Sequence, residues 1–209
     1  MPAAAPRHNP RLRTAEIARM PMFGLAARAA AGGICFAASG GAWAQGIDDV
    51  IRMRVEELRA TGVLEVGDKA VASRDLLSRI YEKREFEPAW KTLRQIDGLL
   101  EMLAESYLEG LEPNDYHGAA LRALRGSLID LDALPPTERA ALDLLLTDSI
   151  IRLGYHLRFG KVDPTKLDPN WNSSRSLTGE DPAVTIQAAI DAPSLREFAS
   201  RAMPRVFLY

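Results

Sequence analysis

Hydrophobic residues recur at helical spacing along most of the chain after residue 46. The first such window shows the pattern, with one apolar helical face made of Val50, Ile51, Val55 and Leu58. Repetition of this spacing between glycine and proline stops predicts five to seven helices. They are expected at residues 48–60, 73–87, 93–108, 115–124, 137–159, 182–190 and 194–202. Residues 63–69 form the one short stretch that suggests a strand or a tight turn.

Polar residues and glycines mark where these helices should begin and end. Side chains that accept hydrogen bonds from a first helical turn are expected as N-caps at Asp48, Ser73, Asn114 or Asp115, and Thr137. Glycines are expected to end three of the helices, at Gly62, Gly110 and Gly160. Pro88 should end the second helix, because the residue before a proline avoids helical backbone angles.

The segment 137–159 is the longest predicted helix, and it is apolar almost all round. A helix without a polar face is contacted on several sides, so this one should lie at the centre of the fold. Asp148 and Arg152 stand four residues apart within it and can pair along one face. We therefore expect a single irregular all-α domain over residues 46–209, built around this central helix.

The first 44 residues have a different character. They hold five arginines and one acid, Glu16, followed by an apolar run of small residues from Ala29 to Ser39. Ala42 and Ala44 then match the small-residue rule for signal peptidase cleavage. The apolar run is shorter than the roughly 20 residues that span a membrane. We therefore predict that residues 1–44 are a signal peptide, removed on export to the periplasm or cell envelope, which leaves no stable membrane span.

Composition narrows the possible chemistry. The whole chain has a net charge of −2, and removal of five arginines and one glutamate leaves −6. Without a basic excess, binding to nucleic acid is not expected. Cys35, the single cysteine, falls in the leader, so the exported chain would contain no thiol and no disulfide. The histidines lack metal-ligand spacing, and serine-nucleophile and phosphate-loop motifs do not occur, so we predict no catalytic residue, metal or cofactor.

Four motifs that combine turn residues with aromatic residues follow one another along the chain. They are Phe86-x-Pro88-x-Trp90, Gly110-Leu111-x-Pro113-x-Asp115-Tyr116, Arg158-Phe159-Gly160-Lys161-Val162-Asp163-Pro164 and Asp168-Pro169-x-Trp171. In this order they resemble the N-terminal scaffold domain of large periplasmic L,D-transpeptidases (the YcbB type). The resemblance covers residues 70–205, which is nearly all of the chain beyond the leader.

The resemblance implies a helical domain that stands beside a catalytic domain of the YkuD type. Such a catalytic domain cross-links peptidoglycan through a cysteine in a motif near S-x-G-C-x-R, by way of a thioester. This sequence contains no such motif, so no catalytic residue is carried over. What carries over is a set of scaffold residues with a structural or interface role: Pro88, Trp90, Gly110, Asp115, Tyr116, Arg158, Phe159, Gly160, Asp163, Pro164 and Trp171.

We therefore expect an exported, non-catalytic scaffold domain, either truncated before its enzyme domain or acting alone in the envelope. It would serve cell-wall biogenesis by contacting an L,D-transpeptidase catalytic module or peptidoglycan itself. The alternative is a stand-alone helical adaptor or binding module of the envelope, unrelated to cell-wall cross-linking. A carboxylate-based enzyme is a weaker third interpretation, because paired acids such as Asp48-Asp49 are normal on exposed helix faces.

Overall fold

The computed structural model describes residues 46–66, 69–161, 177 and 179–203. Its elements in chain order are α1 (Ile47–Thr61), β1 (Glu65–Val66), β2 (Lys69–Ala70), α2 (Arg74–Lys83), α3 (Leu93–Glu105), the 3-10 turns η1 (Ser106–Glu109) and η2 (Pro113–Tyr116), α4 (Gly118–Ser127), α5 (Pro136–Phe159), α8 (Pro182–Asp191) and α9 (Arg196–Ala202). Seven α-helices and one antiparallel hairpin of two-residue strands make up the regular structure of these residues, which confirms the all-α prediction.

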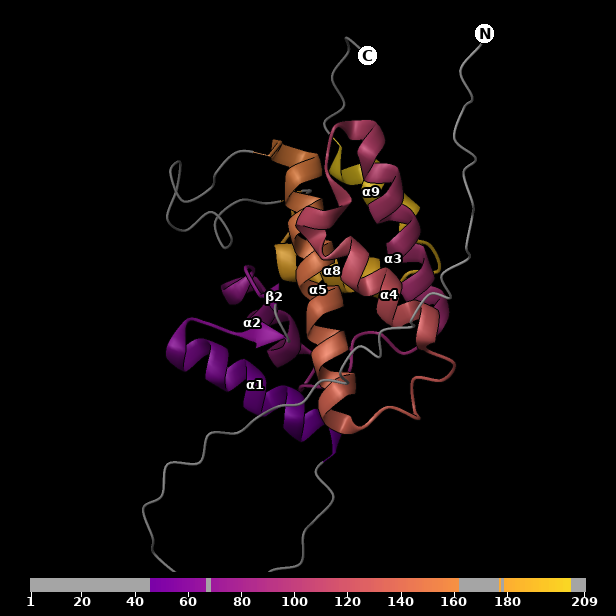
Figure 1. Ribbon diagram of the computed structural model, residues 1–209. Coiled ribbons are helices and arrows are strands. Elements are labelled where there is room, and N and C mark those ends of the chain that lie inside the picture. Colours follow the sequence, from indigo (N-terminus) through magenta and orange to yellow (C-terminus); the bar gives the residue numbers. More distant parts are fainter. Residues whose placement is uncertain (1–45, 67–68, 162–176, 178, 204–209) are drawn as a thin grey trace, which may run out of the picture. The chain divides into compact units, whose positions relative to one another are not determined.

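The long helix α5 runs through the middle of the fold, as predicted from its apolar surface (Figure 1). Helices α1, α2, α3 and α9 and the turn η2 all pack against it. Every residue from Leu142 to Ile151 is buried, so the helix has no solvent-facing stripe over this stretch. Among the described residues, no helix is long and apolar enough to cross a membrane.

Three predicted helices have different boundaries in the structure. The helix expected over residues 73–87 ends at Lys83, before the left-handed backbone of Glu85 and Phe86, so Pro88 does not end it. The segment expected as one helix to residue 108 is α-helical only to Glu105 and then tightens into η1. The helix expected from Asp115 starts at Gly118 instead, because Pro113–Tyr116 forms a separate 3-10 turn. His117 occupies the N-cap position with φ +60°, a left-handed backbone that non-glycine residues rarely adopt. The chain therefore turns sharply just before α4.

The predicted N-caps at Asp48, Ser73 and Thr137 do not cap their helices through their side chains. Asp48 lies inside the first turn of α1, which follows Gly46. Thr137 lies inside the first turn of α5, which begins at Pro136, where a proline ring suits the helical φ. Ser73 does precede α2, but its hydroxyl makes no cap hydrogen bond. The backbone N–H groups at the start of α2 therefore need acceptors from elsewhere in the chain.

Close packing between α5 and α9 depends on a glycine. A Cβ atom on Gly154 would lie 2.7 Å from Cζ of Phe198, closer than real Cβ contacts. Phe198 is itself buried, at 6% exposure, so its ring has little room to retreat. Gly154 therefore sets how near α9 can approach the central helix.

We expect Gly154→Ala to lower the free energy of unfolding by about 1–3 kcal/mol, because the added methyl overpacks the α5–α9 contact. Gly126, inside α4, is the matched control, since a Cβ there meets nothing within 4 Å. Gly126→Ala should instead stabilise the protein by about 0.5–1 kcal/mol through its better helix propensity. Urea unfolding of both variants checks the contrast, and equal effects of the two would contradict it.

Candidate functional site

Polar residues cluster on the buried surface of α5. Five of its buried residues carry polar or charged side chains: Arg139, Asp143, Thr147, Asp148 and Ser149. The two carboxylates are 1% and 0% exposed. Burial of a carboxylate is costly unless its oxygens accept hydrogen bonds. The partners of these two groups therefore show what the polar surface of α5 does.

Asp143 holds the loop that follows α2. Its Oδ1 accepts hydrogen bonds from the Tyr81 hydroxyl (2.6 Å) and the Ala89 N–H (2.9 Å), and its Oδ2 accepts one from the Trp90 N–H (3.1 Å). Burial raises the pKa of Asp143, while these three donors and the charge of Arg139 lower it. One carboxylate thus satisfies two loop N–H groups that would otherwise be buried without partners.

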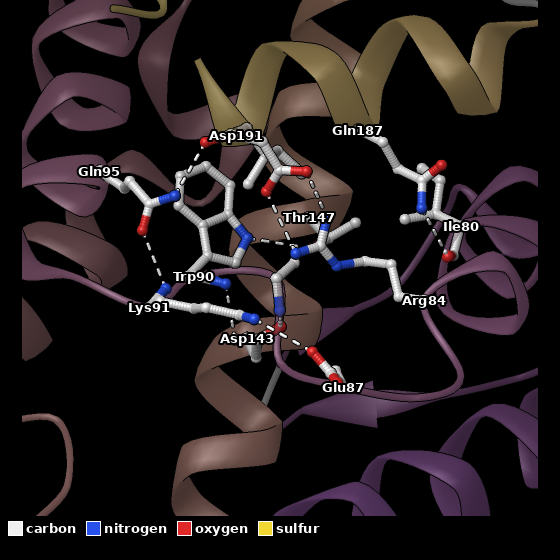
Figure 2. A network of polar contacts seen from close by, with 12 residues as sticks. Ile80, Arg84, Glu87, Trp90, Lys91, Gln95, Asp143, Thr147, Gln187 and Asp191 are labelled. Atoms are coloured by element: carbon white, nitrogen blue, oxygen red, sulfur yellow. Dashed lines mark hydrogen bonds and ion pairs between the residues drawn. The ribbon is translucent and has the colours of Figure 1, made fainter. Parts of the chain in front are cut away.

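Trp90 is fixed at both of its remaining polar groups. Its indole Nε1–H donates to Oγ1 of Thr147 at 3.0 Å (Figure 2), and its carbonyl accepts from Nη2 of Arg139 at 2.6 Å. Its side chain is fully buried. Pro88, two residues earlier, is half-buried in the same loop. Trp90 of the proline–tryptophan motif is therefore anchored to α5.

Asp148 holds two further segments. Its Oδ1 accepts from the N–H groups of Ala72 (3.0 Å) and Ser73 (2.8 Å), so it holds the two residues just before α2. Its Oδ2 lies 3.0 Å from Nε2 of His117 and 3.6 Å from Nη1 of Arg152. The predicted pairing with Arg152 is confirmed, but it is one part of a larger junction.

Three consecutive residues just before α4 each contact α5 or the residues just after it. Tyr116 is fully buried, and its carbonyl accepts a hydrogen bond from the Ser149 hydroxyl at 3.0 Å. The three side-chain pairs are Asp115 Oδ2 with Lys161 Nζ at 2.6 Å, Tyr116 Oη with His156 Nδ1 at 2.8 Å, and His117 with Asp148. The end of η2 and the N-cap of α4 are therefore held against α5 and the residues that follow it.

The Tyr116–His156 hydrogen bond has a defined direction at neutral pH. Burial raises the pKa of the Tyr116 hydroxyl, so this group keeps its proton. Burial and the positive charges of Arg152 and Lys161 lower the pKa of His156, against a smaller opposite effect of Asp115. The neutral imidazole therefore accepts at Nδ1 from the tyrosine hydroxyl.

A third set of contacts ties α8 to the ends of α2 and α3 (Figure 2). Arg84 makes a forked pair with the Asp191 carboxylate at 2.9 and 3.1 Å. Gln95, in the first turn of α3, donates from Nε2 to the carbonyl of Ile190 at 2.8 Å. Both contacts reach the last turn of α8, so this helix is held at its carboxyl end.

The buried polar groups hold the chain, and three of them that meet do not form a nucleophilic triad. Ser73, Asp148 and His117 meet at one place, but the carboxylate lies between the other two residues, whereas a nucleophilic triad places the histidine between serine and acid. Within the described residues the Ser73 hydroxyl makes no hydrogen bond. The same residues contain no group of three or more His, Cys, Asp or Glu side chains that could hold a metal ion.

The scaffold residues singled out in the sequence fall into separate places. Trp90 belongs to the Asp143 junction, while Asp115 and Tyr116 belong to the contacts of η2 with α5. Gly110 is an exposed glycine after η1, with φ +74°. Arg158, Phe159 and Gly160 form the carboxyl end of α5, where Gly160 has φ +79°. Asp163, Pro164 and Trp171 lie outside the described residues.

Sequence reasoning missed the buried polar residues of α5. Arg139, Asp143 and Thr147 follow one another at intervals of four, so they share one face of the helix. The hydrophobic pattern did not reveal this polar face, because apolar residues dominate the segment. Polar residues at helical spacing inside an otherwise apolar helix are the signal that could have identified it.

The described residues thus form an all-α domain whose buried polar residues hold loops and helix ends. Residues 75–209 match the family model described as Scaffold domain. This match covers more than half of the chain, and the chain belongs to that family. The helix α1 and the hairpin precede the matched residues. Comparisons with curated proteins and with solved structures returned no significant match.

We expect Asp143→Asn to lower the free energy of unfolding by about 2–3 kcal/mol, because the amide NH2 would face a loop donor in place of an acceptor. Asp97, which pairs with Arg125 at 2.7 Å but is 47% exposed, is the control. Asp97→Asn should cost at most about 1 kcal/mol. Chemical unfolding measures both, and a small effect at Asp143 would show that its three hydrogen bonds do not hold the loop.

A pH dependence follows from His156. Its pKa is lowered in the folded state, so the unfolded state binds more protons and stability falls as the pH drops below about 6.5. His156→Asn keeps an acceptor near the Nδ1 position and removes the titration. The free energy of unfolding of this variant should therefore change less than that of the native chain between about pH 6.5 and pH 5. Parallel curves for the two proteins would contradict the assignment.

Proposed function

We propose that this chain is the exported, non-catalytic scaffold of an L,D-transpeptidase system that remodels peptidoglycan. In this proposal it acts in the periplasm and holds a catalytic module of the YkuD type in position on the cell wall. The observation that carries the proposal is the match of residues 75–209 to the Scaffold domain family. The order of the four sequence motifs supplies the link to L,D-transpeptidases, and the leader at residues 1–44 supplies the link to export.

The contacts of α5 support a scaffold role physically. A scaffold must keep distant surface segments in a fixed arrangement, so its loops and helix ends need partners in the core. Asp143 and Asp148 provide such partners for the loop before α3 and for the start of α2. Both groups are fully engaged by hydrogen bonds, which suits fixing the chain better than proton transfer.

The chain itself is not expected to form a thioester. Its single cysteine is Cys35, which lies within the leader that export would remove. Cross-linking chemistry would therefore be supplied by the catalytic module, and the scaffold would affect its position or stability. Cross-linking activity can therefore be measured on the catalytic module, and its dependence on the scaffold can be measured separately.

The test mixes the exported form of the chain with a YkuD-type catalytic module and tetrapeptide muropeptides. We expect the two proteins to elute together in size-exclusion chromatography and the yield of cross-linked product to rise, while the scaffold alone yields none. An unrelated periplasmic helical protein of similar size is the control. The proposal would be refuted if the chain bound neither the module nor purified peptidoglycan, and this result would favour a stand-alone envelope adaptor.

Export is tested separately by the mass of the protein from the periplasmic fraction. The A-x-A site predicts a mature chain that begins at Gln45. Recovery of the full-length chain from the cytoplasm would remove the periplasmic part of the proposal.

A further inference from the structure

A pocket of about 410 Å³ lies between the last turn of α1 and the first two turns of α2. Its lining residues are Arg59, Arg74, Asp75, Ser78 and Arg79. Three guanidinium groups against one carboxylate give this lining an excess of positive charge, although the exported chain as a whole is acidic. Counted with Glu82, Asp181 and Lys83, which pair with these residues from outside the lining, the cluster holds four cations and three acids.

Arg74 is seated by the glycine that ends α1. Gly62 has φ +73°, and a Cβ atom there would lie 2.5 Å from Nη1 of Arg74. The guanidinium thus lies directly against the backbone at Gly62, in space that any other residue would fill. The left-handed glycine therefore both ends α1 and leaves room for a charged group at the pocket wall.

Arg74 is paired with the acid of the lining, since its Nε lies 3.5 Å from Oδ1 of Asp75. The other two arginines are held by carboxylates that do not line the pocket. Arg59 pairs with Glu82, and Nη2 of Arg79 lies 2.8 Å from Oδ1 of Asp181. Each pair involves one guanidinium nitrogen, while a guanidinium carries five N–H donors. The acids can therefore orient the two side chains and leave other donors for a ligand.

We propose that this pocket binds a multiply charged phosphate group, such as a diphosphate. A planar carboxylate is satisfied by a single arginine fork, whereas a tetrahedral phosphate presents oxygens to several arginines around it. The Ser78 hydroxyl donates to the Arg74 carbonyl at 2.9 Å, so the arginines carry the recognition. Arg59 lies in α1, before the residues that match the Scaffold domain family, and the site is therefore additional to the scaffold role.

The test is calorimetric titration of the exported chain with inorganic pyrophosphate at low ionic strength. We expect saturable binding with a Kd of about 1 mM or tighter. Arg74→Gln should weaken it about tenfold or more, since a charge-assisted hydrogen bond is lost. Asp75→Asn should strengthen binding, because it removes the carboxylate from the lining. Arg201→Gln, on the exposed surface of α9, is the matched control and should change nothing.

The outcomes are distinguishable. Circular dichroism establishes that each variant is folded, so a lost signal reports on the pocket. Absence of pyrophosphate binding, or equal binding by the Arg74 variant, would overturn the proposal, and so would equally tight binding of succinate. Sedimentation with phosphatidic acid vesicles distinguishes the sources: co-sedimentation that depends on Arg74 assigns the phosphate to a lipid headgroup, and binding of soluble anions alone assigns it to a soluble ligand.

Discussion

The fold depends on two carboxylates that are buried in the middle of the central helix. Asp143 and Asp148 have almost no contact with solvent, and each accepts hydrogen bonds from backbone N–H groups of other elements. An unpaired carboxylate in this position would be very costly, so the loops that supply the donors are held as firmly as the acids themselves. The interior of the domain is thus organised by polar contacts within an apolar shell.

These contacts explain how a domain with short helices can keep a defined shape. Helices α2 and α4 have ten residues each, which is too short for stability without tertiary contacts. The start of α2 is bound to Asp148, and the turn before α4 is bound to α5 through Tyr116 and His117. Each short helix is therefore held at its amino end by the long one.

The sequence predicted those features correctly that depend on interactions between residues close together in the chain. The helix spacing, the glycine stop at Gly62 and the short hairpin all follow from residues within a few positions of one another. Thr92 and Gln95 take part in both a local and a long-range contact. They form a capping box at the start of α3, a pattern visible in four residues. The amide of the same Gln95 also donates to Ile190, a contact that spacing alone does not reveal.

The sequence by itself determined that the chain is helical, that residues 137–159 are central and that its motifs resemble a scaffold domain, because periodicity and motif order are local properties. Only the tertiary structure decided the roles of Ser73, Asp143, Asp148 and His117. Asp143 meets the Ala89 N–H across 54 residues of chain, and Asp148 meets the Ser73 N–H across 75. Contacts over such distances depend on how the helices pack, so the local rule that predicted Ser73 as a cap could not reveal that Asp148 holds its backbone.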